Sequence, residues 1–265
     1  MMSQNAVTPA LEGWALFLNV DGALLETART PREASAPDSL KELLNAVCSR
    51  MDGALALVSG RSIADLDALF APLRFSAAGV HGCERRHATG CLVRPDIDVH
   101  LLDRARETLR KLVDGQPELL LEDKRYGLAV HFRRAPQLRH YVRTIVKVVA
   151  NGLGTEFVMA EGDHVCEIRP SAWSTASAIA AFLSEPPFRG RTPVFLGNDV
   201  TDEEAFGYVN SRGGISIRIG TRSRSLAKYT LGRVSDAVDW LKGIPPVRPP
   251  ISAALTFRVG GQSSE

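Results

Sequence analysis

The chain has 265 residues and 45% hydrophobic content, enough for one large α/β domain or two smaller ones with packed cores. Its net charge of +2 argues against nucleic acid or an anionic membrane as a partner. No apolar run reaches membrane-spanning length and Met1–Thr8 lacks signal-peptide features, so we expect a cytoplasmic protein. Four scattered cysteines without a CxxC pair predict reduced thiols rather than disulfides or a zinc site.

The first part of the chain alternates strands with helices. Trp14–Val20 is a short apolar run typical of a buried strand, and it ends at the turn signal Asp21-Gly22. Further elements are expected in this order: a helix from Ser39, a strand at Ala54–Val58, a helix from Ile63 and a strand at Phe75–Val80. This alternation predicts a parallel, doubly wound sheet with ligands at the carboxyl ends of its strands.

The pattern changes in the middle of the chain, which we interpret as an α+β insertion. Hairpins are expected at His81–Cys91 and Glu118–Phe132, helices at Asp98–Val113 and Gln137–Ala150, and strands at Phe157–Met159 and Val165–Ile168. The second hairpin turns around Lys124–Gly127, and His131 and Arg133 lie two residues apart on one of its faces. One face of the insertion is therefore polar and basic.

The core pattern then returns. We expect a helix at Trp173–Leu183, a strand at Thr192–Leu196, a helix capped by Thr201–Glu204, a strand at Ile215–Ile219 and a helix at Ser235–Leu241. A Pro-rich and then Gly/Ser-rich end is typical of a tail. These elements predict a core domain at 11–82 and 170–242, a cap domain at 83–169, and a disordered tail at 243–265.

Three of the predicted core strands end in polar clusters. These clusters are Asn19-Val20-Asp21, Ser59-Gly60-Arg61 and Asn198-Asp199-Val200-Thr201-Asp202. Each alone is compatible with an ordinary turn or helix cap, and Arg61 alone with a solvated side chain. Because the carboxyl ends of parallel strands lie at one edge of a sheet, the three clusters together predict a site.

On these motifs the chain resembles the haloacid dehalogenase-like phosphatases, and among them the trehalose-6-phosphate phosphatases, over roughly residues 11–241. Ser59-Gly-Arg61, Gly79-Val-His-Gly82 and Glu167-Ile-Arg-Pro170 keep the family pattern. Three positions depart from it. Asn19 stands where the family has its first Asp, Thr175 where it has Lys, and Asn198 where its fourth motif begins with Asp. The resemblance implies a doubly wound α/β core with an inserted α+β cap.

The resemblance also implies a role for each matching position. A carboxylate at position 19 would attack phosphorus, and the acid at position 21 would protonate the leaving sugar oxygen. The implied catalytic residues are Asn19, Asp21, Ser59 and Thr175. The implied ligands of Mg²⁺ are Asn19, Asp21, Asn198, Asp199 and Asp202. The implied binding residues for trehalose 6-phosphate are Arg61, His81, Glu84, Lys124, His131, Arg133 and Glu167.

The three departures fall on the chemistry of the reaction. The amide oxygen of Asn19 is a poor nucleophile and a weaker ligand for Mg²⁺ than a carboxylate. A lysine at position 175 that faced two amides instead of two carboxylates would lose attraction of about 4 kcal/mol per pair at 4 Å. The three losses therefore belong together, and they predict almost no hydrolysis and weakened or lost binding of Mg²⁺.

Three hypotheses about function remain open. The chain is a pseudoenzyme that binds trehalose 6-phosphate, with a trehalose-phosphate synthase or an active paralogue as its candidate protein partner. Alternatively, it is a slow phosphatase that uses Asp21, Asp199 or a metal-bound water in place of Asn19. In the third, the fold serves only as an interaction module, and the polar cap residues form a solvated face.

Overall fold

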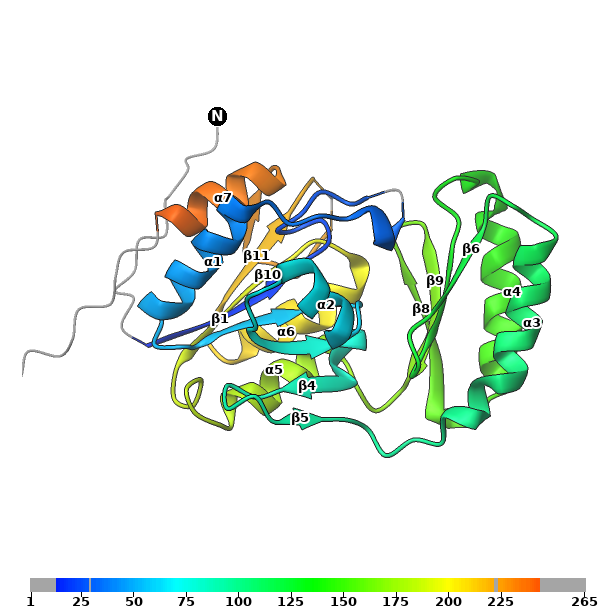
Figure 1. Cartoon of the computed structure of the whole chain (residues 1–265), viewed down its shortest axis with the longest axis horizontal. Coiled ribbons are helices and arrows are strands. Elements are labelled where there is room, and N and C mark those ends of the chain that lie inside the picture. The colour runs from blue at the N-terminus through cyan, green and yellow to red at the C-terminus, as the bar shows by residue number, and fades with distance from the viewer. Residues whose placement is uncertain (1–12, 29, 222–223, 244–265) are drawn as a thin grey trace, which may run out of the picture.

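The computed structural model describes residues 13–28, 30–221 and 224–243. Figure 1 shows a core domain with a central sheet and, beside it, a smaller cap domain with a sheet of its own. The expected tail at 243–265 lies outside the described residues except for Gly243. Among the residues described, no helix is long and apolar enough to cross a membrane.

The core sheet has eight strands in the order β12-β11-β10-β1-β2-β3-β4-β5. Their bounds are β1 Trp14–Asn19, β2 Leu55–Val58, β3 Ser76–Gly79, β4 Glu84–Arg86, β5 Leu92–Val93, β10 Thr192–Gly197, β11 Ile215–Ile219 and β12 Tyr229–Leu231. All pairs from β12 to β3 are parallel, and β4 and β5 add antiparallel strands at one edge. The predicted doubly wound α/β sheet is confirmed.

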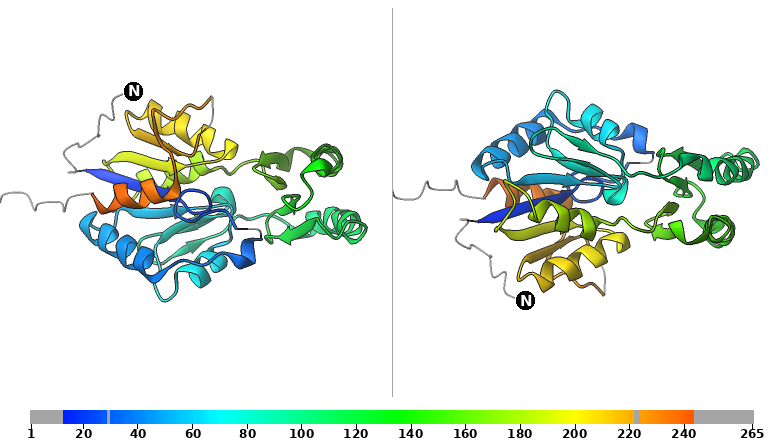
Figure 2. Two further views of the ribbon diagram at one scale, coloured as in Figure 1. Left: turned by 90° about the horizontal axis from the view of Figure 1, so that it is seen from above. Right: turned by 90° about the horizontal axis from the view of Figure 1, so that it is seen from below.

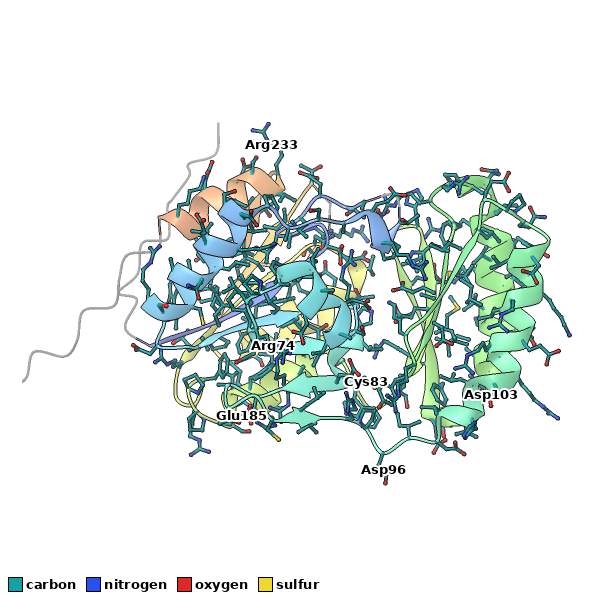
Figure 3. All side chains as sticks on the ribbon, viewed as in Figure 1. Arg74, Cys83, Asp96, Asp103, Glu185 and Arg233 are labelled. Carbon is teal, nitrogen blue, oxygen red and sulfur yellow. The ribbon has the colours of Figure 1, made fainter. Side chains whose placement is uncertain are left out.

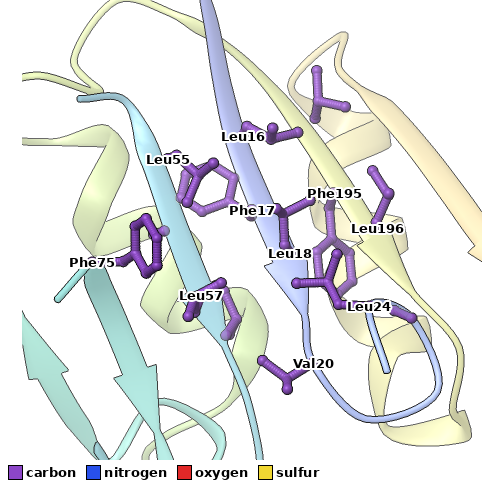
Figure 4. Packing of buried hydrophobic residues seen from close by; sticks show 14 of the residues in the cluster. Leu16, Phe17, Leu18, Val20, Leu24, Leu55, Leu57, Phe75, Phe195 and Leu196 are labelled. Atoms are coloured by element: carbon purple, nitrogen blue, oxygen red, sulfur yellow. The ribbon is translucent and has the colours of Figure 1, made fainter. Parts of the chain in front are cut away.

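Helices cover both faces of this sheet (Figure 2). They are α1 Asp38–Arg50, α2 Ile63–Phe70, α5 Thr175–Leu183, α6 Glu203–Ser211 and α7 Val234–Lys242. Side chains of a strand point alternately to its two faces, and Phe17 and Phe195 point to the face of α5 and α6, where they contact Phe182 and Phe206. Figure 4 shows the apolar side chains of β1, β2 and β10 packed together, which fixes the strand ends that carry the polar clusters.

The cap is a four-stranded antiparallel sheet covered by two helices on its outer side (Figure 1). Its strands, in sheet order, are β6 Leu120–Asp123, β7 Leu128–His131, β9 Val165–Pro170 and β8 Phe157–Gly162, and its helices are α3 Asp103–Asp114 and α4 Arg139–Asn151. The apolar faces of the helices pack on one face of the sheet and form a hydrophobic cluster separate from that of the core. The other face of the cap sheet is turned toward the core domain.

Two segments of chain join the cap to the core on one side of the molecule, where Figure 3 labels Cys83 and Asp96. A small apolar cluster fills this junction and contains Val80, Cys83 and Tyr126, with Trp173 packed against it. Val80 and His81 have φ values of 47° and 54°. The left-handed region is costly for a β-branched residue such as Val80, so tertiary contacts hold this junction in a strained shape.

Two sequence predictions about the fold need correction. Residues 84–93 were assigned to the cap, but β4 pairs with β3 and β5 with β4, so this hairpin extends the core sheet. A change from alternating strands and helices to a hairpin does not by itself mark a domain boundary. The helix N-cap predicted at Thr201–Glu204 was also misplaced. A 3₁₀ turn at Val200–Asp202 precedes α6, and the Asp199 side chain caps that turn.

Candidate active site

The polar strand ends of the core face the inner side of the cap sheet across a pocket of about 160 Å³. The pocket brings together eleven of the residues predicted from the sequence: Asn19, Asp21, Ser59, Arg61, His81, Lys124, His131, Arg133, Glu167, Asn198 and Asp199. The core side chains follow β1, β2 and β10, which are neighbouring parallel strands. Their convergence follows from the topology of the sheet.

Asn19 ends β1 and is held by three hydrogen bonds. Its Nδ2 donates to Asp202 Oδ2 over 2.8 Å and to Asn198 Oδ1 over 3.3 Å. Its Oδ1 accepts from the Val20 N–H over 2.7 Å. The Asn198 side chain lies tightly against Gly22, where a Cβ would meet Asn198 Nδ2 at 2.1 Å. The two amides therefore pack directly against one another and against the loop after β1.

Asp202 lies beneath these amides and is 2% exposed. Its Oδ2 accepts from Asn19 Nδ2 and from the backbone N–H groups of Asn198 and Asp199. Burial disfavours the carboxylate and raises the pKa of Asp202 above its ordinary value, although the N–H groups oppose this. Asp202 thus organises the loop after β10 and does not line the pocket.

Asp21 and Arg61 form a bidentate ion pair. Arg61 Nε and Nη2 each donate to one oxygen of Asp21 over 2.7 Å, and Arg61 Nη1 donates to the Pro31 carbonyl over 2.8 Å. Burial opposes the charge of Arg61, but the hydrogen bonds and charge of Asp21 outweigh it and raise the pKa of Arg61. Both oxygens of Asp21 accept from the guanidinium, so each already has a hydrogen-bond partner.

The cap side of the pocket contains a buried charged network. Lys124 Nζ donates to both oxygens of Glu167 over 3.1 Å, and His81 Nε2 lies 3.0 Å from Glu167 Oε2. Burial disfavours both charges, but Lys124 and His81 hold the pKa of Glu167 well below its ordinary value, and Glu167 and Glu122 raise the pKa of Lys124. Lys124 and Glu167 are therefore a charged pair that remains paired in the closed pocket.

The register of the cap sheet explains why this network leaves space beside it. Cross-strand neighbours form the row Glu122, Ala129, Glu167 and Ala160 on the face turned to the core. Ala129 separates the two carboxylates, and Ala160, on the other side of Glu167, lines the pocket. The Glu122 carboxylate accepts from His131 Nε2 over 2.8 Å. Alternating acidic and small residues thus form a polar floor that suits hydroxyl groups.

The family model described as trehalose-phosphatase matches residues 17–235. The chain belongs to this family. It is 41% identical over 242 residues to a trehalose-6-phosphate phosphatase of Escherichia coli (strain K12), with 89% of each protein covered. The C-terminal domain of trehalose-6-phosphate phosphatase from C. albicans superposes with a TM-score of 0.76 at 18% identity, over 86% of this chain and 90% of that one. A phosphatase of the haloalkanoate (HAD) superfamily from Bacteroides thetaiotaomicron gives a TM-score of 0.58 at 14% identity, over 91% and 96%. The last two similarities show the shared fold.

Phosphatases of this superfamily generally use Mg²⁺, which prefers anionic oxygen ligands in octahedral geometry. In this trehalose-phosphatase family member, Asn19 turns an N–H toward Asn198 and Asp202. One oxygen of Asp199 accepts from the Val200 N–H and the other from the Asp163 N–H. The described residues contain no group of three or more His, Cys, Asp or Glu side chains that could hold a metal ion. In this arrangement the side-chain oxygens of Asn19, Asn198 and Asp199 already accept hydrogen bonds.

Two predicted site residues other than Asp202 lie outside the pocket lining. Glu84 is buried, and its Oε2 accepts from the Ile63 N–H over 2.9 Å at the start of α2. Thr175 is buried as the first residue of α5, directly after the N-cap Ser174. Its neutral hydroxyl cannot supply the positive charge that a lysine would carry there. The roles suggested for Glu84 and Thr175 remain predictions.

Two charged residues of the pocket lining escaped the sequence prediction. Glu122 bonds to His131, and Asp163 accepts from Arg133 Nη2 over 2.8 Å. Glu122 had a detectable signal, because it lies two residues before Lys124 in a strand and so shares its face. Asp163 had no such sequence signal, because it lies in the turn between β8 and β9 and its position depends on how the cap meets the core.

Proposed function

We propose that this chain binds trehalose 6-phosphate and hydrolyses it very poorly or not at all. The observation that carries the proposal is the hydrogen bonding of Asn19. Its Nδ2 donates to Asp202 and Asn198, and its Oδ1 accepts from the Val20 N–H, so position 19 offers neither a charged nor a free oxygen for attack. We extend the proposal to Mg²⁺, which would bind weakly or not at all.

The binding half of the proposal rests on the cap. Hydrogen-bond donors and acceptors line the pocket on Lys124, Glu122, His131 and Glu167 of the cap and on His81 at the junction. Sites that hydrogen-bond the hydroxyl groups of a ligand discriminate strongly, because an analogue without them leaves buried polar groups unpaired. A sugar phosphate matches this combination of polar floor and basic groups. A trehalose-phosphate synthase or an active paralogue would be the protein partner that responds to the bound ligand.

The alternative is an active, Mg²⁺-dependent trehalose-6-phosphate phosphatase, and the 41% identity to the Escherichia coli protein of that name favours it. The assay is release of phosphate from trehalose 6-phosphate by the purified chain, with and without Mg²⁺. The proposal predicts a rate at least about 10³-fold below that of an active family member measured in parallel. Robust turnover that requires Mg²⁺ would replace the proposal with the alternative.

If phosphate release is absent, thermal unfolding with trehalose 6-phosphate separates a binder from a scaffold. A ligand at 100 times its Kd stabilises the native state by about 2.7 kcal/mol, which raises the Tm of a chain of this size by several degrees. Trehalose and inorganic phosphate are the control ligands. Arg133→Ala, which alters the pocket, should weaken the shift, whereas Arg134→Ala, outside the pocket lining, should preserve it. No shift at any concentration favours a scaffold.

A further inference from the structure

A second hollow, called here the cleft, lies beside the pocket between cap and core. Its volume is about 680 Å³, and its lining includes Arg139 and His164 from the cap and Arg218, Gly220 and Arg233 from the core. Small-molecule sites typically occupy about 300–1,000 Å³. The cleft lies within this range and the pocket of about 160 Å³ below it. The pocket as closed is therefore small for a disaccharide phosphate.

The pocket and the cleft share a wall. The residues that line both hollows are Thr27, Gly162, Asp163, Asn198 and Asp199. A hydrogen bond crosses from cap to core within this wall, because the Asp163 N–H donates to Asp199 Oδ2 over 3.0 Å. The other oxygen of Asp199 accepts from the Val200 N–H over 2.6 Å and so keeps the carboxylate in this orientation. Asp199 thus holds the turn between β8 and β9 against the loop after β10.

Both partners of this hydrogen bond are fixed on their own domains. The Asp163 side chain accepts from Arg133 Nη2 over 2.8 Å and lies 2.8 Å from His164 Nδ1, which anchors the turn within the cap. Gly162 allows the approach, because a Cβ there would lie 2.5 Å from Asp199 Oδ2 and 2.9 Å from Val165 Cγ1. Any side chain at position 162 would push the turn away from Asp199.

This contact lies far from the junction between the domains. In the β8–β9 hairpin, Phe157 pairs with Pro170 at the end next to the junction, and Gly162 pairs with Val165 at the opposite end. The strained backbone at Val80 and His81 and the cluster around Cys83 and Tyr126 lie at the junction. The cap is consequently fixed at one end by covalent connections and at the other by the Asp163–Asp199 hydrogen bond.

We infer that Asp199 is the latch of the cap, and that its release joins the pocket and the cleft into one space through which the ligand passes. The identity of the ligand rests on the proposed function, but the latch itself does not. Asp199, which the sequence suggested as a metal ligand, acts here as a positioning residue. Its carboxylate engages the cap through the Asp163 N–H.

The latch is tested first in the ligand-free protein by hydrogen exchange at the Asp163 amide. Asp199→Ala removes the acceptor and should accelerate this exchange about ten- to hundredfold, as expected for loss of a hydrogen bond to a charged group. Gly162→Ala should also accelerate exchange of the Asp163 amide while Asp199 is still present. This second variant tests the latch even if Asp199→Ala disturbs the loop after β10. Gly115→Ala is the matched control, because a Cβ there makes only ordinary contacts at 3.8 Å or more. Unchanged exchange in both variants would overturn the latch.

The passage is tested by the kinetics of binding of trehalose 6-phosphate. Asp199→Ala and Gly162→Ala should raise both the association and the dissociation rate constants several-fold relative to Gly115→Ala, because opening no longer limits either step. Faster exchange with unchanged rate constants would overturn the assignment of the cleft as the passage. If neither the unmodified chain nor any variant binds the sugar phosphate, the proposed function fails. Hydrogen exchange at the Asp163 amide then still tests whether Asp199 holds the cap closed.

Discussion

The two walls of the pocket carry different kinds of polar groups. On the core wall, the Asn19 amide bonds both the Asn198 side chain and the buried Asp202 carboxylate, and Asp21 and Arg61 form an ion pair. On the cap wall, Lys124 and Glu167 are buried charges in a network that reaches the pocket. A buried ion pair costs so much desolvation that it rarely adds stability. Stability alone therefore does not account for the charged pair of the cap wall, which is consistent with the ligand-binding role proposed above.

Rebuilding the core wall tests this comparison with the largest expected effect. Asn19→Asp, Thr175→Lys and Asn198→Asp together restore the carboxylates and the lysine of the family pattern. With Mg²⁺ and trehalose 6-phosphate, phosphate release should rise about 10³-fold or more over the unmodified chain. The double variant without Asn19→Asp is the control and should stay inactive. A folded triple variant without activity would mean that the cap wall or Asp21 is not competent either.

Breaking the charged pair of the cap wall should have the largest effect on stability. Lys124→Met removes the cation and leaves the buried Glu167 without its lysine partner and with His81 still 3.0 Å away. The free energy of unfolding should fall by about 3–5 kcal/mol, as measured by denaturant titration. Lys111→Met is the control, because Lys111 forms an exposed pair with Glu107 on α3. A loss below about 1 kcal/mol in Lys124→Met would show that the pair is solvated and would weaken the contrast between the walls.

The sequence predicted the core wall better than the cap wall. Asn19, Ser59 and Asn198 follow parallel strands, so topology alone brings them together. Glu84 matched a motif, but its contact with the Ile63 N–H depends on β4 joining the core sheet. The contact of Asp163 with Asp199 depends on the angle between two domains, which no local pattern encodes.

Changing only Asn19 should separate the role of its amide from the rest of the core wall. Asn19→Asp replaces the N–H that bonds Asp202 with a second carboxylate oxygen about 2.8 Å away. The free energy of unfolding in EDTA should fall by about 1.5–3 kcal/mol, and Mg²⁺ should restore part of it by screening the two carboxylates. The unmodified chain should show no Mg²⁺ dependence of Tm.

The control for this variant is Asn45→Asp, an exposed position on α1. It should leave both the Tm and its response to Mg²⁺ unchanged. A Mg²⁺-dependent Tm in the unmodified chain would contradict the proposal that Mg²⁺ binds weakly or not at all.

The smallest expected effect is on the pH dependence of stability. It tests whether Glu167 of the cap wall is ionised beside Lys124. The pKa of Glu167 is held below its ordinary value of 4.5, so its contribution is present above that pH and is lost as pH falls toward the folded-state value. Glu167→Gln removes one titrating group and should reduce the slope of the unfolding free energy against pH by up to about 1.4 kcal/mol per pH unit below pH 4.5. Glu118→Gln, at an exposed position, should leave the slope unchanged. Equal slopes in both variants would mean that Glu167 is not ionised against Lys124, and the difference between the two walls would disappear.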